Sequence, residues 1–279
     1  MEQKLILITN DDGVEAQGLA VLTQWMLGLG EVIVVAPDSS RSGAALAITC
    51  TQAVTLTRRA ELEQDRLQVY AASGTPVDCV KLGLEQVCPR RPDLIVSGIN
   101  HGDNASCSIH YSGTMGAVIE GCMKDVPSIG YSLRTLKRRC DFSPYEEEVV
   151  RIARFVLENG LPQDTCLNVN FPEVPRLAGM RVCRMGRGRW VQEWIPANNP
   201  RGMNAYWLTG NFLNLEPHNE DTDYWALDHG FGSITPIKLD MTDYTLFSHL
   251  APLMESSSPV DSPAHPSPSS RGMGNNYSL

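Results

Sequence analysis

Hydrophobic and polar positions follow two different periods along the first half of this chain. Short, continuous apolar runs such as LILIT and EVIVVAP are typical of strands that are buried on both faces of a parallel sheet. Between these runs, apolar residues recur every three or four positions, which is the pattern of a helix that packs one face against a core. This alternation predicts an α/β fold with a mostly parallel, doubly wound sheet. The pattern predicts strands at residues 4–9, 31–37, 54–57, 67–72, 92–98 and 127–133, and helices at 19–29, 75–87 and 112–125.

Two helix starts can be predicted from local chemistry. Thr75 can accept a hydrogen bond from the first turn of the helix that follows it, and Pro76 suits a first helical position. Ser143 is followed by Pro144 and, three residues on, by Glu146, which predicts a capping box at the start of a later helix.

The pattern changes after residue 140. A helix is expected over 143–160, and strands over 166–172 and 232–240. The stretch between those strands is rich in Gly, Asn, Pro and Trp, which predicts extended hairpins instead of another strand–helix unit. The last segment is dominated by Ser and Pro and cannot bury enough apolar surface to order itself. We therefore expect a core at 1–140, a smaller part with a protruding hairpin at 141–255, and a disordered tail at 256–279.

Composition and charge exclude several classes of protein. The chain has 279 residues and a formal net charge of -9, whereas general nucleic-acid binders carry a basic excess, so no stable nucleic-acid partner is expected. The N-terminus lacks the apolar core of a signal peptide, and no apolar run approaches the roughly 20 residues of a membrane span. The eight cysteines form no C-x-x-C pair, which favours free thiols in a reducing compartment. We expect a cytoplasmic protein with no membrane partner.

Oxygen-bearing side chains follow three of the predicted strands. Asp11 and Asp12 come directly after the first strand, Ser42 follows the second, and Asn100 follows the strand at 92–98. Ligands bind beyond the carboxyl ends of the strands in such folds, so these side chains are expected in one crevice. Two carboxylates, a hydroxyl and an amide oxygen suit Mg²⁺ or Mn²⁺, and without a cation one carboxyl should have a raised pKa. A simple Asn-Asp turn is the alternative for NDDG alone; the two further donors favour the metal site.

A second group of candidate residues stands at the start of the helix predicted at 112–125. The free N–H groups of a helix N-terminus attract anions, and Ser112, Gly113 and Thr114 could present hydroxyls and backbone N–H groups to a phosphate. The alternative is an ordinary helix cap with glycines for close packing. His101 and His110 lie near the expected site and could transfer a proton, although a supporting or solvated role is favoured for each.

Taken together, these motifs resemble the SurE family of survival-protein nucleotidases. The matching segments span about residues 4–245: ILITNDDG, VVAPDSSRSG, SGTPVDCV, LIVSGINHGDN, YSGTMGAVIEG, LNVNFP and DTDYWALDHGFGSITPIKLDMT. The resemblance implies a divalent-metal-dependent phosphatase that acts on nucleoside 5′- and 3′-monophosphates. It also implies a Rossmann-like core, a C-terminal part with a protruding hairpin, and a homodimer or homotetramer that exchanges C-terminal segments. The family's metal ligands fall on the four strand-end residues already collected, Asp11, Asp12, Ser42 and Asn100.

The working hypothesis is phosphomonoester hydrolysis with one divalent ion per subunit. Asp11 and Asp12 anchor the metal, and one of them orients or deprotonates the attacking water. The candidates for holding the phosphate are Asn104, Ser112, Gly113 and Thr114. Two alternatives stay open at this point. One is a nucleotide-binding regulator without turnover, and the other is a receiver-like phosphorylation sensor, although the sensor needs a third Asp where this chain has Asn100.

Overall fold

The structure is a computed structural model that describes the chain except residues 1–2, 136, 138, 199–201, 203 and 256–279. The expected Ser- and Pro-rich tail therefore lies outside the described residues. The fold divides into two compact units, residues 1–239 and 240–279, which we describe separately. In the second unit, α6 (Tyr244–Met254) is a helix that the sequence pattern did not predict.

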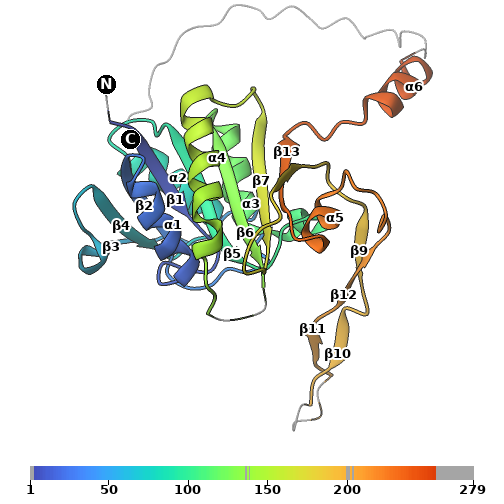
Figure 1. Ribbon diagram of the computed structural model, residues 1–279, viewed down its shortest axis with the longest axis horizontal. Helices are drawn as coiled ribbons and strands as arrows, with labels where there is room; N and C mark the ends of the chain where they lie inside the picture. Colours follow the sequence, from blue (N-terminus) through green and yellow to red (C-terminus); the bar gives the residue numbers. More distant parts are fainter. Residues whose placement is uncertain (1–2, 136, 138, 199–201, 203, 256–279) are drawn as a thin grey trace, which may run out of the picture. The chain divides into compact units, whose positions relative to one another are not determined.

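A nine-stranded sheet forms the centre of the first unit (Figure 1). Its order is β3-β4-β2-β1-β5-β6-β7-β13-β8. The six strands from β4 to β7 in this order are parallel. β3 pairs antiparallel with β4, and β13 pairs antiparallel with β7 but parallel with β8. The strands are β1 (Leu5–Thr9), β2 (Glu31–Pro37), β3 (Leu56–Arg58), β4 (Leu67–Ala72), β5 (Leu94–His101), β6 (Ser128–Arg134), β7 (Thr165–Pro172), β8 (Met180–Val182) and β13 (Gly232–Lys238).

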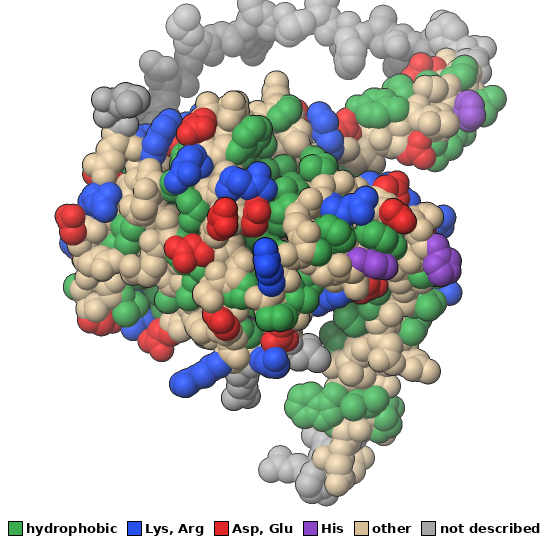
Figure 2. Space-filling view, in the orientation of Figure 1, with side chains coloured by type: hydrophobic (Ala, Val, Ile, Leu, Met, Phe, Trp, Pro, Cys, Tyr) green, Lys and Arg blue, Asp and Glu red, His purple; other side chains and the backbone are tan. Residues whose placement is uncertain are grey.

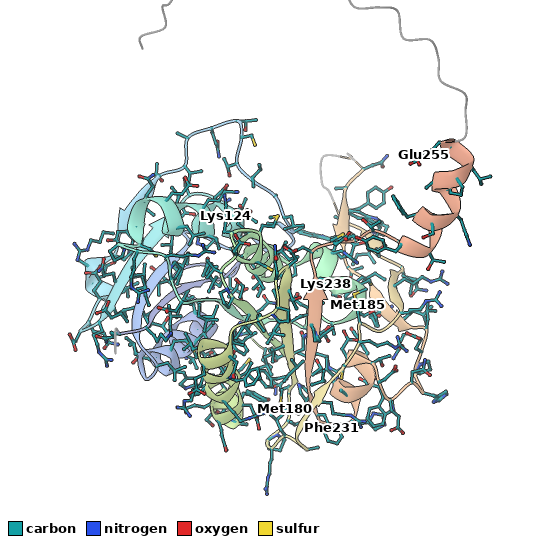
Figure 3. The ribbon with its side chains drawn as sticks, turned by 90° about the horizontal axis from the view of Figure 1, so that it is seen from above. Lys124, Met180, Met185, Phe231, Lys238 and Glu255 are labelled. Atoms are coloured by element: carbon teal, nitrogen blue, oxygen red, sulfur yellow. The ribbon has the colours of Figure 1, made fainter. Side chains whose placement is uncertain are left out.

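Helices cover both faces of this sheet. The helices of this unit are α1 (Gln17–Leu27), α2 (Pro76–Leu82), α3 (Gly113–Met123), α4 (Glu146–Asn159) and α5 (Asp223–Asp228). Side chains of β1 alternate between two cores: Ile6 and Ile8 join α1 and α4, whereas Leu5 and Leu7 join α2 and α3. Figure 3, which looks from above, shows helices on the two sides of the sheet. The predicted doubly wound α/β fold is confirmed.

Two short antiparallel ribbons extend from the sheet-bearing body of the first unit, in place of another strand–helix unit (Figure 1). The first pairs β9 (Gly188–Val191) with β12 (Asn211–Asn214), and the second pairs β10 (Trp194–Pro196) with β11 (Tyr206–Leu208). The predicted extended hairpin is therefore present. The predicted domain division after residue 140 stays a prediction; β7 and β13, which lie beyond it, pair into the same sheet as the earlier strands.

One predicted helix start is confirmed and one is wrong. Thr75 caps α2, and Asp78 completes a capping box with it. Ser143, in contrast, does not cap α4, which begins at Glu146 after a short 3₁₀ turn. The reason is local competition: Asp141 accepts a hydrogen bond from the Ser143 N–H at 2.9 Å and draws the chain into that turn.

Some predicted boundaries also move. The strand expected at 54–57 runs from Leu56 to Arg58, and the strand expected at 92–98 continues to His101. Asn100 therefore lies inside the last part of β5. No helix in the described part of the chain has both the length and the apolar character that a bilayer crossing requires.

Candidate metal and phosphate site

The candidate site lies where three neighbouring strands end. β1 pairs with β2 on one side and with β5 on the other, all parallel, so their carboxyl ends share one edge of the sheet. The chain leaves β1 toward β2 and returns later to β5 on the opposite side, which makes this edge the topological switch point. The predicted metal ligands therefore come from the ends of three adjacent strands.

The turn after β1 is built by Asn10 and Gly13. The Asn10 side chain accepts a hydrogen bond from the Gly13 N–H at 3.2 Å and donates one to the Gly13 carbonyl at 3.0 Å. The N–H of Val14 donates to the Pro37 carbonyl at 2.8 Å, which ties the turn to β2. Asn10 thus supplies the turn chemistry, and the two following carboxyl groups are not needed for it. The turn and the metal interpretations of NDDG are compatible.

Asp11 is the most buried acid of the site. Its side chain belongs to a residue only 4% exposed, and its Oδ1 accepts a hydrogen bond from the Thr114 hydroxyl at 2.6 Å. A Cβ atom at Gly113 would lie 2.8 Å from the Asp11 Cβ, so the approach of α3 to this acid requires a glycine. The start of α3 and the end of β1 are therefore in direct contact.

The pKa of Asp11 is raised to about 6: burial is the largest cause, the Thr114 hydrogen bond lowers the pKa, and the neighbouring Asp12 charge raises it. A raised pKa in one of the two carboxyls was expected from their repulsion. Burial by the surrounding protein is the larger cause, which sequence alone does not reveal. A cation at this place would stabilise the ionised form of Asp11.

Asp12 is less buried and lies beside His101. Its side chain is 19% exposed, and its Oδ2 accepts a hydrogen bond from the His101 backbone N–H at 3.3 Å. The His101 Nδ1 lies 3.6 Å from the same oxygen, and the ring packs edge-on against Phe142. His110 is exposed. Of the two histidines considered from sequence, His101 is thus the one that contacts a candidate ligand.

Asn100 and Ser42 differ in their hydrogen-bond partners at this edge of the sheet. The amide nitrogen of Asn100 donates to the Gly102 carbonyl at 2.8 Å, which orients the amide oxygen as the atom available to a cation. The loop after β2 is tied to the site by the Arg41 N–H, which donates to the Asp11 carbonyl at 2.7 Å. Ser42 is exposed, and its hydroxyl lies 3.0 Å from the Ser40 hydroxyl. The backbone just before Ser42 is thus tied to the end of β1.

The candidate phosphate residues at the start of α3 are engaged inside the protein. The Ser112 hydroxyl accepts a hydrogen bond from the Met115 N–H at 3.0 Å, which is the ordinary cap considered above. The Thr114 hydroxyl is used on Asp11. What Gly113 and its neighbours offer a phosphate is therefore the positive end of the helix and its backbone N–H groups.

Asn104 lies in a buried polar network. Its carboxamide donates to the Ser132 hydroxyl at 2.8 Å, and its backbone N–H donates to the Asn170 Oδ1 at 2.7 Å. Asn168 donates to the Asn104 carbonyl at 2.8 Å and accepts from Asn170 at 2.9 Å. Sequence reasoning did not assign the two asparagines of β7 to the site region. The available signal was the alternation of Asn with apolar residues in LNVNFP, which is unusual for a buried strand.

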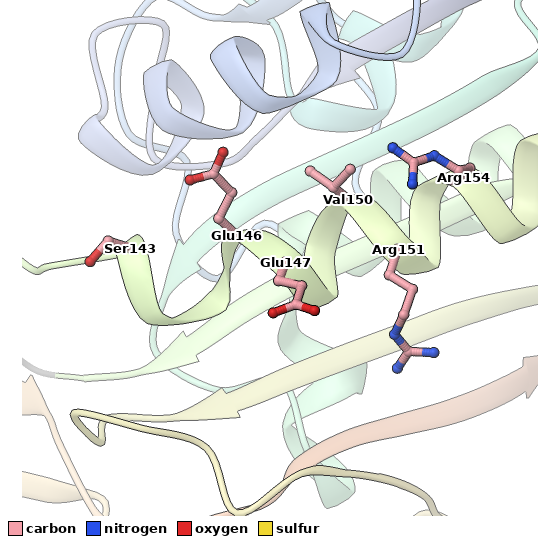
Figure 4. Close-up of a pocket in the computed structure, with 6 residues that line it drawn as sticks. All are labelled: Ser143, Glu146, Glu147, Val150, Arg151 and Arg154. Carbon is pink, nitrogen blue, oxygen red and sulfur yellow. The ribbon is translucent and has the colours of Figure 1, made fainter.

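A surface hollow lies apart from these residues. It has a volume of about 580 Å³, and Figure 4 shows the side chains of α4 and the turn before it that line it. The lining residues are Ser143, Glu146, Glu147, Val150, Arg151 and Arg154. Across the described residues, no group of three or more His, Cys, Asp or Glu side chains is arranged to hold a metal.

Comparison with known proteins places this chain among relatives of one kind. The model of the family described as survival protein SurE matches residues 6–192. The 5′-nucleotidase SurE of Phocaeicola vulgatus is 53% identical over 249 residues, which covers 89% of this chain and 96% of that protein. The 5′-nucleotidase SurE of Bacteroides thetaiotaomicron is 49% identical over 254 residues, with 90% and 96% covered.

A solved structure agrees with these relatives. The crystal structure of the SurE protein from Aquifex aeolicus superposes with a TM-score of 0.76 at 33% sequence identity, covering 89% of this chain and 99% of that one. The fold and the sequence therefore point to the same relatives over nearly the same length. This chain belongs to the SurE family.

Proposed function

We propose that this chain is a metal-dependent 5′-nucleotidase, which hydrolyses nucleoside monophosphates to nucleoside and inorganic phosphate. The observation that carries the proposal is the Asp11–Asp12 pair at the switch point, with Asp11 buried against the start of α3. The relatives named 5′-nucleotidase SurE, 53% and 49% identical over most of this chain, support it. Hydrolysis of 3′-monophosphates is part of the same proposal.

The residues present fit one divalent ion per subunit. A buried carboxyl with a raised pKa beside a second acid is a place where a cation lowers the free energy. Asp11, Asp12, the Asn100 amide oxygen and the Ser42 hydroxyl are the proposed ligands. Such an all-oxygen set suits Mg²⁺ or Mn²⁺. When bound, the ion supplies Lewis acidity and lowers the pKa of water.

The chain's own residues bind and orient the substrate. The N-terminus of α3, from Ser112 to Thr114, favours a negatively charged phosphate through its free N–H groups. Thr114 holds the Asp11 carboxyl in one orientation, and the half-buried Asp12 accepts the proton of the attacking water. The bonds of Asn104 to the buried network favour a role in fixing this loop over direct contact with phosphate.

The proposal is tested by phosphate release from AMP, GMP and a 3′-monophosphate in the presence of Mn²⁺ or Mg²⁺. We expect turnover that EDTA abolishes and that Asp11→Asn reduces at least 1,000-fold, on the order of 4 kcal/mol of transition-state stabilisation. Asp65→Asn is the matched control, because that side chain is 97% exposed. If the wild type binds nucleotide but releases no phosphate, the regulator alternative is favoured. If labelled phosphate is trapped on Asp11 or Asp12, the carboxylate attacks directly and the water mechanism is wrong.

A homodimer or homotetramer is the proposed assembly, with the β10–β11 ribbon as a contact. Trp194, Trp207 and Leu208 are 63%, 67% and 67% exposed on that ribbon, and exposed apolar side chains gathered in this way mark interaction sites. Figure 2 shows hydrophobic side chains along this part of the molecule. A cytoplasmic location stays a prediction.

A further inference from the structure

Asp223, the first residue of α5, is a fully buried carboxylate that the proposed reaction does not use. Its Oδ2 accepts a hydrogen bond from the Ser106 N–H at 2.8 Å. Its Oδ1 accepts hydrogen bonds from the Gly186 N–H at 2.9 Å and from the Tyr224 N–H at 2.8 Å. An ionised carboxylate can only accept hydrogen bonds, and here backbone N–H groups donate to both of its oxygens.

The three donors belong to three separate segments of the chain. Ser106 opens a 3₁₀ turn, Ser106–Tyr111, that leads directly into the cap of α3. Gly186 precedes β9 and the hairpin, and Tyr224 belongs to α5 itself. The Ser106 hydroxyl also donates to the Gly186 carbonyl at 2.7 Å, so the loop and the hairpin base are joined twice. Asp223 therefore binds the backbone of all three segments.

The backbone at Ser106 has a conformation that its surroundings must stabilise. Ser106 has a φ of +51°, a left-handed conformation that non-glycine residues adopt only when their surroundings stabilise it. At Gly186, a Cβ atom would lie 3.0 Å from the Asp223 Oδ1, which matches the close approach of that backbone to the acid. The loop between Asn100 and Ser112 thus depends on an acid 117 residues away in sequence.

We propose that Asp223 is a positioning residue for phosphate binding. By fixing Ser106, it sets the place of the turn that delivers the N-terminus of α3, and so the place of the N–H groups that receive the phosphate. This inference rests on the proposed function. The proposed metal ligands belong to β1, β5 and the loop after β2, which Asp223 does not contact. Loss of the carboxylate should therefore weaken phosphate binding more than metal binding, which this turn reaches only indirectly, through the contact of Thr114 with Asp11.

The test compares Asp223→Asn with Asp221→Asn. The asparagine keeps the size of the side chain but puts an NH₂ group where one carboxylate oxygen accepts, so at least one backbone N–H loses its partner. Asp221 is the matched control, because its side chain is 66% exposed and bonds Arg184 on the surface. For Asp223→Asn we expect the KM for AMP and the inhibition constant of inorganic phosphate to rise about tenfold, and the Kd of Mn²⁺ to rise by a clearly smaller factor. Asp221→Asn should match the wild type in all three.

A second readout does not depend on activity. Amide hydrogen exchange over residues 105–112 should be at least tenfold faster in Asp223→Asn than in the wild type, with residues 5–9 of β1 unchanged. Should Asp223→Asn fail to fold, Gly186→Ala disturbs the same contact from the other side and should give the same pattern. A kcat loss at unchanged KM and unchanged phosphate inhibition, or unchanged exchange, overturns the positioning role. A wild type that releases no phosphate overturns the proposed function instead, and the exchange experiment still tests the contact.

Discussion

At the scale of single residues, Asp11 is an acid whose burial disfavours its ionised form. It is 4% exposed, lies beside Asp12 and accepts one strong hydrogen bond from Thr114. Strongly perturbed carboxyl groups of this kind cluster at functional sites, because function requires the charge that stability opposes. The pair of acids is visible in the sequence, but their different burial is not, since Gly113 and Thr114 of α3 supply it.

The raised pKa of Asp11 predicts how stability depends on pH. The carboxyl has a pKa of about 6 in the folded protein against an ordinary 3.8, so the folded state holds its proton more tightly. Stability from this group is therefore complete below about pH 4 and is lost as the pH rises through 6. With EDTA present, Asp11→Asn should stabilise the protein at pH 7.5 by on the order of 3 kcal/mol and by little at pH 4.

Urea unfolding of the Asp11→Asn variant and the wild type between pH 4 and 8 measures this difference. Asp65→Asn serves as the control and should show no pH-dependent gain. A variant that is less stable than the wild type at pH 7.5 would contradict the assigned environment of Asp11.

At the scale of elements, the loop after β2 is anchored on the start of α2. The capping box of Thr75 and Asp78 is visible in the sequence, because its two members are three residues apart. Asp78 also accepts hydrogen bonds from the Thr49 N–H at 3.2 Å and hydroxyl at 2.6 Å, and Thr75 donates to the Ala47 carbonyl at 2.7 Å. One cap therefore fixes both a helix and the loop that carries Ser42.

Removal of this anchor should have an acid-dependent cost. Burial alone would raise the pKa of Asp78, but hydrogen bonds from Thr49 and Thr75 lower it overall. A lowered pKa gives stability that is present above the ordinary value and lost as the pH falls through the folded one. Asp78→Ala should cost roughly 1–3 kcal/mol at pH 7, and the difference from wild type should shrink below about pH 4.

Thermal unfolding at pH 3 and pH 7 checks this expectation, and limited proteolysis reports whether residues 42–52 are released. Asp65→Ala is the surface control. An equal loss of stability at both pH values would show that the ionised carboxylate is not the anchor.

At the scale of the whole molecule, the β10–β11 ribbon cannot bury its own side chains. Its register places Ile195 opposite Trp207 on one face, and Trp194 opposite Leu208 on the other. All four are at least half exposed in this single chain. A two-stranded ribbon with two apolar faces is not stable alone in water, so a second copy of the chain is the expected cover.

Trp207→Ser should therefore shift the protein toward a smaller species. Light scattering after size-exclusion chromatography measures the mass at several concentrations, and we expect at least a tenfold weaker association. Phe155→Ser is the control, because that side chain is 58% exposed on α4, away from the ribbon in sequence and in fold. A wild type that is monomeric at all concentrations, or a variant that assembles equally well, would contradict the proposed contact.

Features that depend on near neighbours can be predicted from the amino-acid sequence of this protein. Periodicity predicts the alternating strands and helices. Because parallel strands end at a common edge, it also predicts that Asp11 and Asn100 lie near each other. The cap at Thr75 followed from residues in adjacent turns. The capping box predicted at Ser143 does not form. Asp141, which lies outside the expected motif, accepts a hydrogen bond from the Ser143 N–H, the group that Glu146 would bind in a capping box.

Which polar groups are buried, and which residues hold them, depends on the packing of the folded chain. Contacts between residues far apart in sequence, such as Thr114 with Asp11 across 103 positions and Asp223 with Ser106 across 117, leave no local pattern. The pKa of Asp11 near 6 follows from such contacts, because the loss of water around a carboxyl depends on everything packed against it. The identity of the site residues is thus local information, and their electrostatic state is a property of the packed fold.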